Sequence, residues 1–248
     1  MTGQTIVAWP VARATFRDRG RSAMAAVLVA LLMLAGASLT TPDHWGAEAF
    51  SGFGTAMFVC LNLLLGAGLL AEEIESGHAQ LVLLRPLTRA AWYGGRLAGV
   101  VLAISVAVGL GWGTTVFASV ARGTPVELGI RVLILPLIIV WAASWLSVLA
   151  AIGAVAPSWT NAGIVILFAA GYGMLNGLML VIRPEWAALM QRIGHYLGPV
   201  NPVEIALSLR AGEKADWGPL AYDLVWLFGS WTVGVHLLNR RELARRRP

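Results

Sequence analysis

Residues 132–156 read VLILPLIIVWAASWLSVLAAIGAVA, a run of 25 residues with no Asp, Glu, Lys, Arg or His. A helix rises about 1.5 Å per residue, so about 17–25 apolar residues cross the hydrocarbon core of a bilayer. In lipid the backbone must satisfy its own hydrogen bonds, which a helix does within a single run. The run therefore predicts a transmembrane helix.

The composition of the whole chain agrees with a membrane protein. Of its 248 residues, 58% are hydrophobic and only 12% are charged, and the mean hydropathy is +0.72. Soluble domains carry about 25% charged residues, roughly twice this fraction. The net charge is +5, but most basic residues lie at the ends of the apolar runs. We therefore expect membrane lipid as a partner, and no nucleic acid.

Six apolar runs are long enough to span a bilayer. The first five contain no Asp, Glu, Lys or Arg, and we expect Asp223 and His236 in the sixth to lie near the interfaces, where water solvates them. The chain is thus predicted to be a single all-α domain, residues 1–248, that is integral to the membrane. The predicted spans are Ser22–Leu39, Gly52–Ala71, Leu97–Val120, Val132–Ala156, Asn161–Ile182 and Pro219–Leu238.

The distribution of basic residues predicts the orientation. Six spans put both termini on one side, and that side carries twelve of the 18 Lys and Arg residues. Cytoplasmic loops hold the excess of Lys and Arg, so both termini are predicted to be cytoplasmic. We expect a multi-pass protein of the bacterial plasma (inner) membrane. The loop from Arg183 to Gly218 is then the longest on the outer side.

The start of the chain allows another interpretation. Arginines followed by the apolar run Met24–Ala37 are also typical of a secretory signal peptide. Its removal would place the two termini of the mature chain on opposite sides, whereas the basic tail RRELARRR, residues 240–247, favours the cytoplasm. Before the first span, Thr5–Arg19 mixes Trp9 and aliphatic side chains with arginines, which predicts an interfacial helix, with a disordered basic leader as the alternative.

The predicted cytoplasmic segment 72–96 gathers charge of both signs. Three glutamates, Glu72, Glu73 and Glu75, lie where the positive end of a helix dipole favours anions. Side chains at steps of three or four predict that this helix continues with one face toward the bilayer or a partner. These side chains are Ile74, His78, Leu81 and Leu84.

A break and a second helix follow in the same segment. Pro86 disfavours helical geometry at Arg85 and so ends the first helix. Thr88 is a suitable N-cap for a helix that runs through Arg89 and Arg96 into the third span. This elbow fits a rigid surface that docks a soluble partner, but an ordinary charged loop explains the arginines as well.

The order of residues in this elbow resembles that of ABC-2 type transporter permeases. That family shows an acidic stretch, a Gly, a Leu-rich run, a Pro with a nearby Arg, and a Lys further on. Arg96 stands where the Lys is usual. Arg13 before the first span and HYLGPVNPVEIALSL, residues 195–209, are also similar to the family. The matching positions of the elbow are Glu72, Glu73, Glu75, Gly77, Leu81–Leu84, Pro86, Arg89 and Arg96.

The resemblance implies a transport subunit that exports an apolar or amphipathic substrate. Its partners would be a second permease copy or paralogue, forming a dimer, and a cytosolic ABC ATPase that carries ATP and Mg²⁺. A cytoplasmic coupling helix between the second and third spans would receive the movement of the ATPase. The residues implied in this coupling elbow are Glu72, Glu73, Glu75, Gly77, Leu81, Arg85, Pro86, Arg89 and Arg96. The chain has no GxxxxGK[ST] phosphate loop, so we expect it to bind no cofactor itself.

Few other residues suggest chemistry. Asn62 and Asn176 are amides at membrane depth, which either bond to another helix or line a pathway or interface. The four histidines are far apart and there is one cysteine, so we expect neither a metal site nor a catalytic site. The alternative function is a non-transporting six-span membrane protein, such as an immunity factor or an assembly scaffold.

Overall fold

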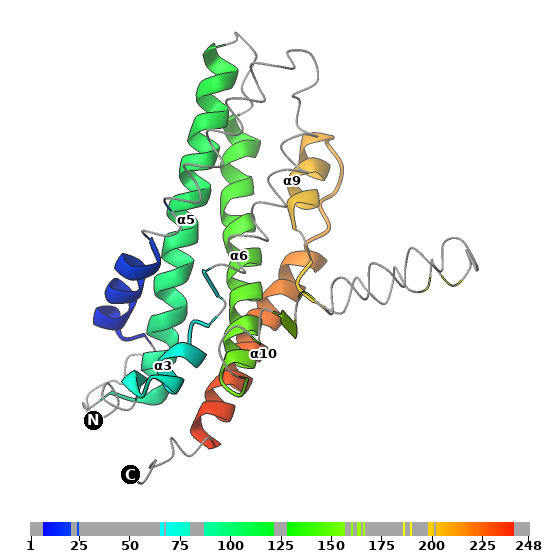
Figure 1. Cartoon of the computed structure of the whole chain (residues 1–248). Helices are drawn as coiled ribbons and strands as arrows, with labels where there is room; N and C mark the ends of the chain where they lie inside the picture. The colour runs from blue at the N-terminus through cyan, green and yellow to red at the C-terminus, as the bar shows by residue number, and fades with distance from the viewer. Residues whose placement is uncertain are drawn as a thin grey trace, which may run out of the picture.

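The computed structural model describes a helical protein (Figure 1). The described residues are 7–20, 24, 65–66, 68–79, 87–121, 128–156, 160, 163–164, 166, 186, 189, 198–200 and 202–240. These residues contain no strand. The helices are residues 9–20, α3 (Ala71–Glu75), α5 (Arg89–Ala121), α6 (Leu128–Gly153), α9 (Val203–Arg210) and α10 (Gly218–Arg240). The all-α prediction is therefore confirmed for this part of the chain.

Two helices in the described part are long and apolar enough to cross a membrane, Arg89–Leu110 of α5 and Val132–Gly153 of α6. They correspond to the predicted third and fourth spans. The predicted sixth span coincides with α10, although α10 is less apolar than the other two. The predicted spans 22–39, 52–71 and 161–182 lie largely outside the described residues.

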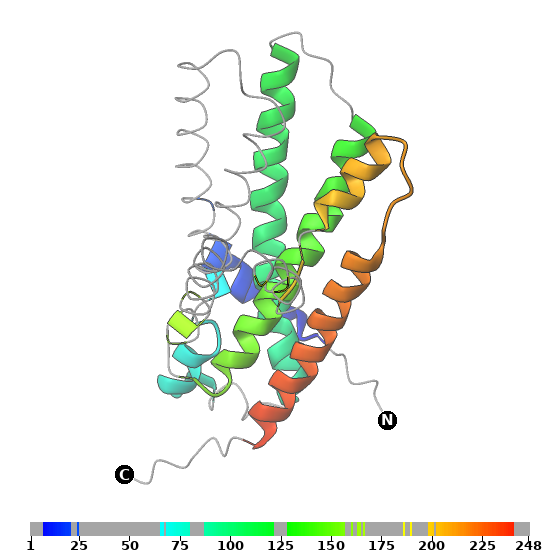
Figure 2. The ribbon, with the colours of Figure 1, turned by 90° about the vertical axis from the view of Figure 1, so that its right-hand side faces the viewer.

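The core forms where α5 and α6 run side by side (Figures 1 and 2). Small residues of both helices, among them Ala103, Ala107 and Ala142, are buried there and let the backbones approach. Larger side chains fill the remaining space, including Ile104 of α5 and Leu146 of α6. Between membrane helices this kind of packing takes the place of the hydrophobic effect, because lipid tails are as apolar as the core.

The third long helix, α10, packs along the half of α6 that ends at Gly153 (Figure 2). Hydroxyl groups line this contact, because Ser144 and Ser147 of α6 donate to the carbonyls of Asp223 (2.8 Å) and Leu227 (3.0 Å). Ser230 of α10 donates to the Ser147 hydroxyl at 2.9 Å. The contact between α6 and α10 is therefore a polar seam within an apolar bundle.

The prediction that Asp223 is solvated is wrong, because this residue is fully buried. Its Oδ1 accepts a hydrogen bond from the Val200 amide at 2.8 Å. Asp223 lies more than one helical turn inside α10, and the segment before α9 covers it. His236, by contrast, is exposed.

Candidate coupling site

The acidic helix of the elbow is shorter than predicted. We expected it to continue past His78 to Leu84, but α3 contains only Ala71–Glu75 and Ser76 caps its end. Gly77 follows in the left-handed conformation with φ of 75°, which only glycine adopts freely and which typically ends a helix. Ile74 packs against the core cluster that contains Ala79, while His78 is exposed, so Ile74 and His78 do not share one face.

Two glutamates of α3 form ion pairs within the chain. Glu72 pairs with Arg19 of the N-terminal helix at 2.8 Å between Oε2 and Nη2. Glu73 pairs with Arg96 of α5. Glu75 is exposed and also has an interaction within the protein. The acidic cluster thus connects three helices at one end of the bundle.

Arg96 lies at the centre of this connection. Its side chain is only 11% exposed, and its Nη1 donates to the Thr15 hydroxyl at 2.8 Å. Thr15 is fully buried, and its hydroxyl donates in turn to the carbonyl of Val11 at 2.9 Å. We call the group Thr15, Arg19, Glu72, Glu73 and Arg96 the ionic junction. It fixes the N-terminal helix and α3 to the beginning of α5.

The N-terminal helix fits closely against α5 because two glycines there carry no side chain. A Cβ on Gly95 would lie 2.8 Å from the carbonyl oxygen of Ala8, and one on Gly99 would lie 2.5 Å from that of Ala12. The Ala8 amide also donates to the carbonyl of Ala91 at 3.0 Å. This Gly95xxxGly99 spacing is the small-residue pattern that lets two helices approach closely.

The second helix of the elbow begins as predicted. The Thr88 hydroxyl accepts a hydrogen bond from the Ala91 amide at 3.1 Å, which is the geometry of an N-cap. From Arg89 the helix continues through Arg96 to Ala121 without a break. The predicted cap and the predicted continuous helix are both confirmed.

Arg89 joins the elbow to the far end of the chain. Its Nη1 donates to the carbonyls of Leu238 (2.8 Å) and Asn239 (3.1 Å), the last groups of α10 that have no partner within a helix. A cation at this end is also favoured by the helix dipole. Arg89 therefore caps α10 from the first position of α5.

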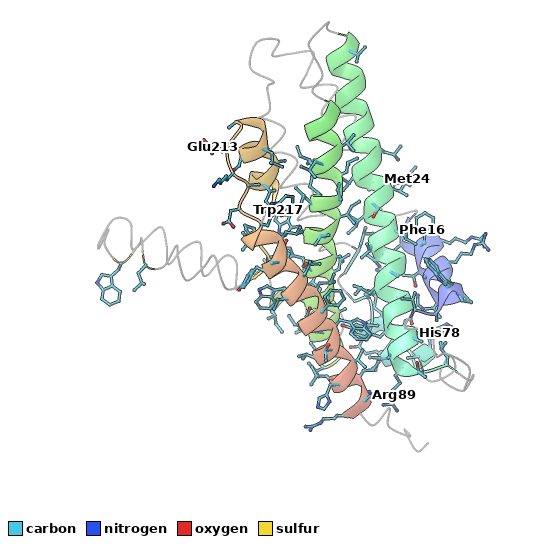
Figure 3. All side chains as sticks on the ribbon, turned by 180° about the vertical axis from the view of Figure 1, so that it is seen from behind. Phe16, Met24, His78, Arg89, Glu213 and Trp217 are labelled. Carbon is cyan, nitrogen blue, oxygen red and sulfur yellow. The ribbon has the colours of Figure 1, made fainter. Side chains whose placement is uncertain are left out.

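The elbow end of the molecule presents a small polar surface. Exposed side chains there come from the end of α3 and from the turn before α5, and Figure 3 shows His78 and Arg89 at this end. The exposed residues are Glu75, Ser76, His78 and Thr88. These groups are exposed, whereas Glu72 and Glu73 are partly buried.

Several predicted site residues lie outside the described part of the chain. They are Asn62, Leu81, Arg85, Pro86 and Asn176. Sequence reasoning missed Thr15 and Arg19 as members of the site. The predicted orientation could have indicated Arg19, because it places the N-terminal arginines and the acidic cluster on the same side of the membrane.

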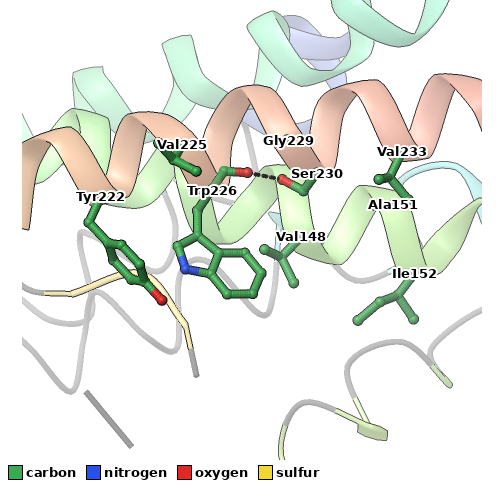
Figure 4. Close-up of a pocket in the computed structure, with 9 residues that line it drawn as sticks. All are labelled: Val148, Ala151, Ile152, Tyr222, Val225, Trp226, Gly229, Ser230 and Val233. Carbon is green, nitrogen blue, oxygen red and sulfur yellow. Dashed lines mark hydrogen bonds between the residues drawn. The ribbon is translucent and has the colours of Figure 1, made fainter. Parts of the chain in front are cut away.

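A second feature is an open apolar groove between α6 and α10, with a volume of about 490 Å³ (Figure 4). Val148, Ala151 and Ile152 line it from α6, and Tyr222 and Trp226 lie on its α10 side. The Ser230 hydroxyl at its edge is engaged with the Trp226 carbonyl and the Ser147 hydroxyl. The groove thus offers aliphatic and aromatic surface, of the kind that lipid tails contact.

The sequence matches no protein-family model and no curated protein.

Proposed function

We propose that the chain is the permease subunit of an ATP-driven ABC-2 type exporter in the bacterial inner membrane, with six spans and both termini in the cytoplasm. A separate cytosolic ABC ATPase supplies ATP and Mg²⁺, and a second permease copy or paralogue completes the dimer. The substrate is apolar or amphipathic. The proposal is supported by the apolar helices α5 and α6 and by the construction of the elbow between the second and third predicted spans.

The observation that carries the proposal is the ionic junction. An element that receives force from a partner has to be connected to the membrane helices, and α3 is connected through Glu73 and Arg96 to α5. It is connected through Glu72 and Arg19 to the N-terminal helix, which packs on the same face of α5. A displacement of α3 would therefore move the base of α5 directly, through the contact between Glu73 and Arg96.

The partner would contact the exposed end of α3. Glu75 and His78 are exposed on either side of Gly77, whereas Glu72 and Glu73 form the ion pairs with Arg19 and Arg96. A charge reversal at Glu75 therefore changes the docking surface and leaves the two ion pairs in place. Reversal of Glu73 would instead break the junction, so it does not test docking.

The test is purification of the full-length chain from native membranes after mild crosslinking, with identification of the proteins that accompany it. Wild type should retain a soluble ABC ATPase, and a Glu75→Lys/His78→Glu variant should lose most of it. Glu213→Lys is the matched control. Glu213 is also exposed, but it lies before the first residue of α10, at the end of this helix that is remote from the elbow. An ATPase that never appears with wild type, or one that all three chains retain equally, would contradict the proposed function.

The same junction also favours a second function, that of a non-transporting membrane protein such as an immunity factor or an assembly scaffold. The ion pairs of Glu72 and Glu73 explain two acidic residues without any external partner. In that case the purified chain carries no ATPase. The same experiment separates the two functions.

A further inference from the structure

A buried carboxyl group lies at the opposite end of α10 from the elbow. Asp223 has no exposed surface. Its Oδ1 accepts from the Val200 amide at 2.8 Å, and its own backbone carbonyl accepts from the Ser144 hydroxyl. Its Oδ2 is buried without a hydrogen-bond partner. An ionised carboxylate can accept about four hydrogen bonds, so the single bond from the Val200 amide satisfies it poorly.

No cation compensates this carboxyl group within the described part of the chain. The ion pairs between described residues join Glu72 to Arg19 and Glu73 to Arg96, both at the other end of α10. The surfaces of α6 and of residues 198–200 and 202 that pack around Asp223 carry no ionisable side chain, and the described side chains of α9 are uncharged. On its own helix the neighbouring titratable group is Tyr222, and the charged residues before α10 are Glu213, Lys214 and Asp216, all three exposed.

Asp223 holds residues 198–200, a segment of the predicted outer loop that directly precedes α9. Besides the Val200 amide, the Pro199 carbonyl accepts from the Trp141 indole at 3.3 Å. A Cβ on Gly198 would lie 3.0 Å from the Trp145 ring. Residues 198–200 are thus fastened to α6 by two tryptophans and to α10 by a single carboxyl oxygen.

We propose that Asp223 is a proton-binding site and that its neutral carboxyl group, protonated at Oδ2, fastens residues 198–200 to the bundle. A buried carboxylate without a cation is far more costly than a neutral carboxyl group with one unpaired O–H. Loss of the proton therefore favours conformations in which water reaches the carboxylate, and these require the segment to leave. The device responds to pH at the predicted outer end of α10, and it is independent of any ATPase partner.

The sign of the effect follows from proton linkage. The buried carboxyl group of the closed form holds its proton more tightly than an Asp in water does, so release of the segment becomes easier as pH rises. Between the pH at which the open form loses this proton and the higher pH at which the closed form loses it, opening is coupled to the release of one proton. The opening equilibrium then increases about tenfold per pH unit.

The first measurement is the infrared spectrum of the full-length protein in lipid nanodiscs, with ¹³C in the side-chain carboxyl of aspartate. Wild type should show the carbonyl band of a protonated carboxyl group, shifted by the label, at about pH 5, where an exposed Asp is already ionised. Asp223→Asn should lack this band, and Asp216→Asn, which changes an exposed carboxylate before the same helix, should keep it. Absence of the band from wild type would overturn the proposal.

The second measurement is hydrogen–deuterium exchange of the peptide 198–202, whose amides are few because Pro199 and Pro202 have none. After correction for the intrinsic exchange rate, Val200 should exchange faster as pH rises in wild type and in Asp216→Asn. In Asp223→Asn, which keeps the acceptor and cannot ionise, it should not respond to pH. If Asp223→Asn does not fold, the wild-type titration decides alone. The infrared band must then disappear in the pH range where Val200 exchange accelerates, and exchange that ignores pH refutes the proposal.

Discussion

Arg96 shows what a single buried cation does at the base of α5. Its side chain is 11% exposed, and its charge is balanced by Glu73, with Thr15 accepting a further hydrogen bond. Arg96 Nε and Glu73 Oε2 are buried without partners, so the pair is only partly satisfied. Such a pair contributes little net stability, but removing one partner leaves the other charge buried and uncompensated. Its role is therefore to hold α3 and the N-terminal helix in one position.

The two ion pairs of α3 should differ in their effect on stability. Glu73→Gln leaves the Arg96 charge buried and should lower the free energy of unfolding by ~3–5 kcal/mol. Glu72→Gln, whose side chain is 39% exposed, should cost at most ~1 kcal/mol. Unfolding in mixed detergent micelles measures both. Replacing both charges, in Glu73→Gln/Arg96→Gln, should recover part of the loss, and equal losses for the two single variants would disprove the assignment.

Arg89 allows a prediction about a helix end. Arg89→Gln removes the charged donor from the carbonyls of Leu238 and Asn239 and should loosen the last turn of α10. A charged hydrogen bond of this kind contributes about 1.5–3 kcal/mol. Hydrogen–deuterium exchange of residues 234–240 should therefore accelerate, with Arg13→Gln, an exposed arginine of the N-terminal helix, as the control. Equal exchange in the two variants would show that α10 does not depend on this cap.

At the scale of elements, the structure depends on contacts between segments that are distant in the chain. The sequence predicted what is local, such as the Thr88 cap and the continuity of α5 from Arg89, because these follow from neighbouring residues. It did not predict the partners of Glu72 and Asp223, which lie 53 and 23 residues away. The end of α3 was missed for a different reason, since a left-handed Gly77 outweighed an apolar spacing that favoured a longer helix.

The docking of the N-terminal helix on α5 can be tested with two alanine substitutions in the same helix. Gly99→Ala places a methyl group 2.5 Å from the Ala12 carbonyl and 2.6 Å from the Thr15 Cβ, atoms that move only if the whole N-terminal helix moves. The cost should be ~1–3 kcal/mol. Gly109→Ala meets nothing within 4 Å and should gain up to ~1 kcal/mol from helix propensity.

Limited trypsin digestion reports the same event directly. If Gly99→Ala displaces the N-terminal helix, cleavage after Arg13 and Arg17 should become faster than in wild type. In Gly109→Ala it should stay at the wild-type rate. Cleavage at the wild-type rate in both variants would mean that docking of the N-terminal helix does not depend on Gly99.

At the scale of the whole molecule, the two ends of the bundle differ in chemistry. The elbow end gathers α3, the first turn of α5 and the last turn of α10, joined by arginines. The other end places the segment before α9 over the buried Asp223. If α5, α6 and α10 span the membrane, these two ends face opposite compartments. The predicted orientation puts the arginine-rich end in the cytoplasm.

This orientation can be measured by labelling single cysteines in intact cells. In a Cys60→Ser background, which removes the one native cysteine, Ser76→Cys reports the end of α3 and Ala211→Cys the turn between α9 and α10, both exposed positions. A membrane-impermeant maleimide should label Ala211→Cys and not Ser76→Cys. After the membrane is permeabilised, both should react, which shows that each is accessible. Labelling of Ser76→Cys in intact cells would place the elbow outside and exclude docking of a cytosolic ATPase. Equal protection of both sites would mean that α9 and the elbow lie on one side, so the number of spans between them would be even rather than the predicted three.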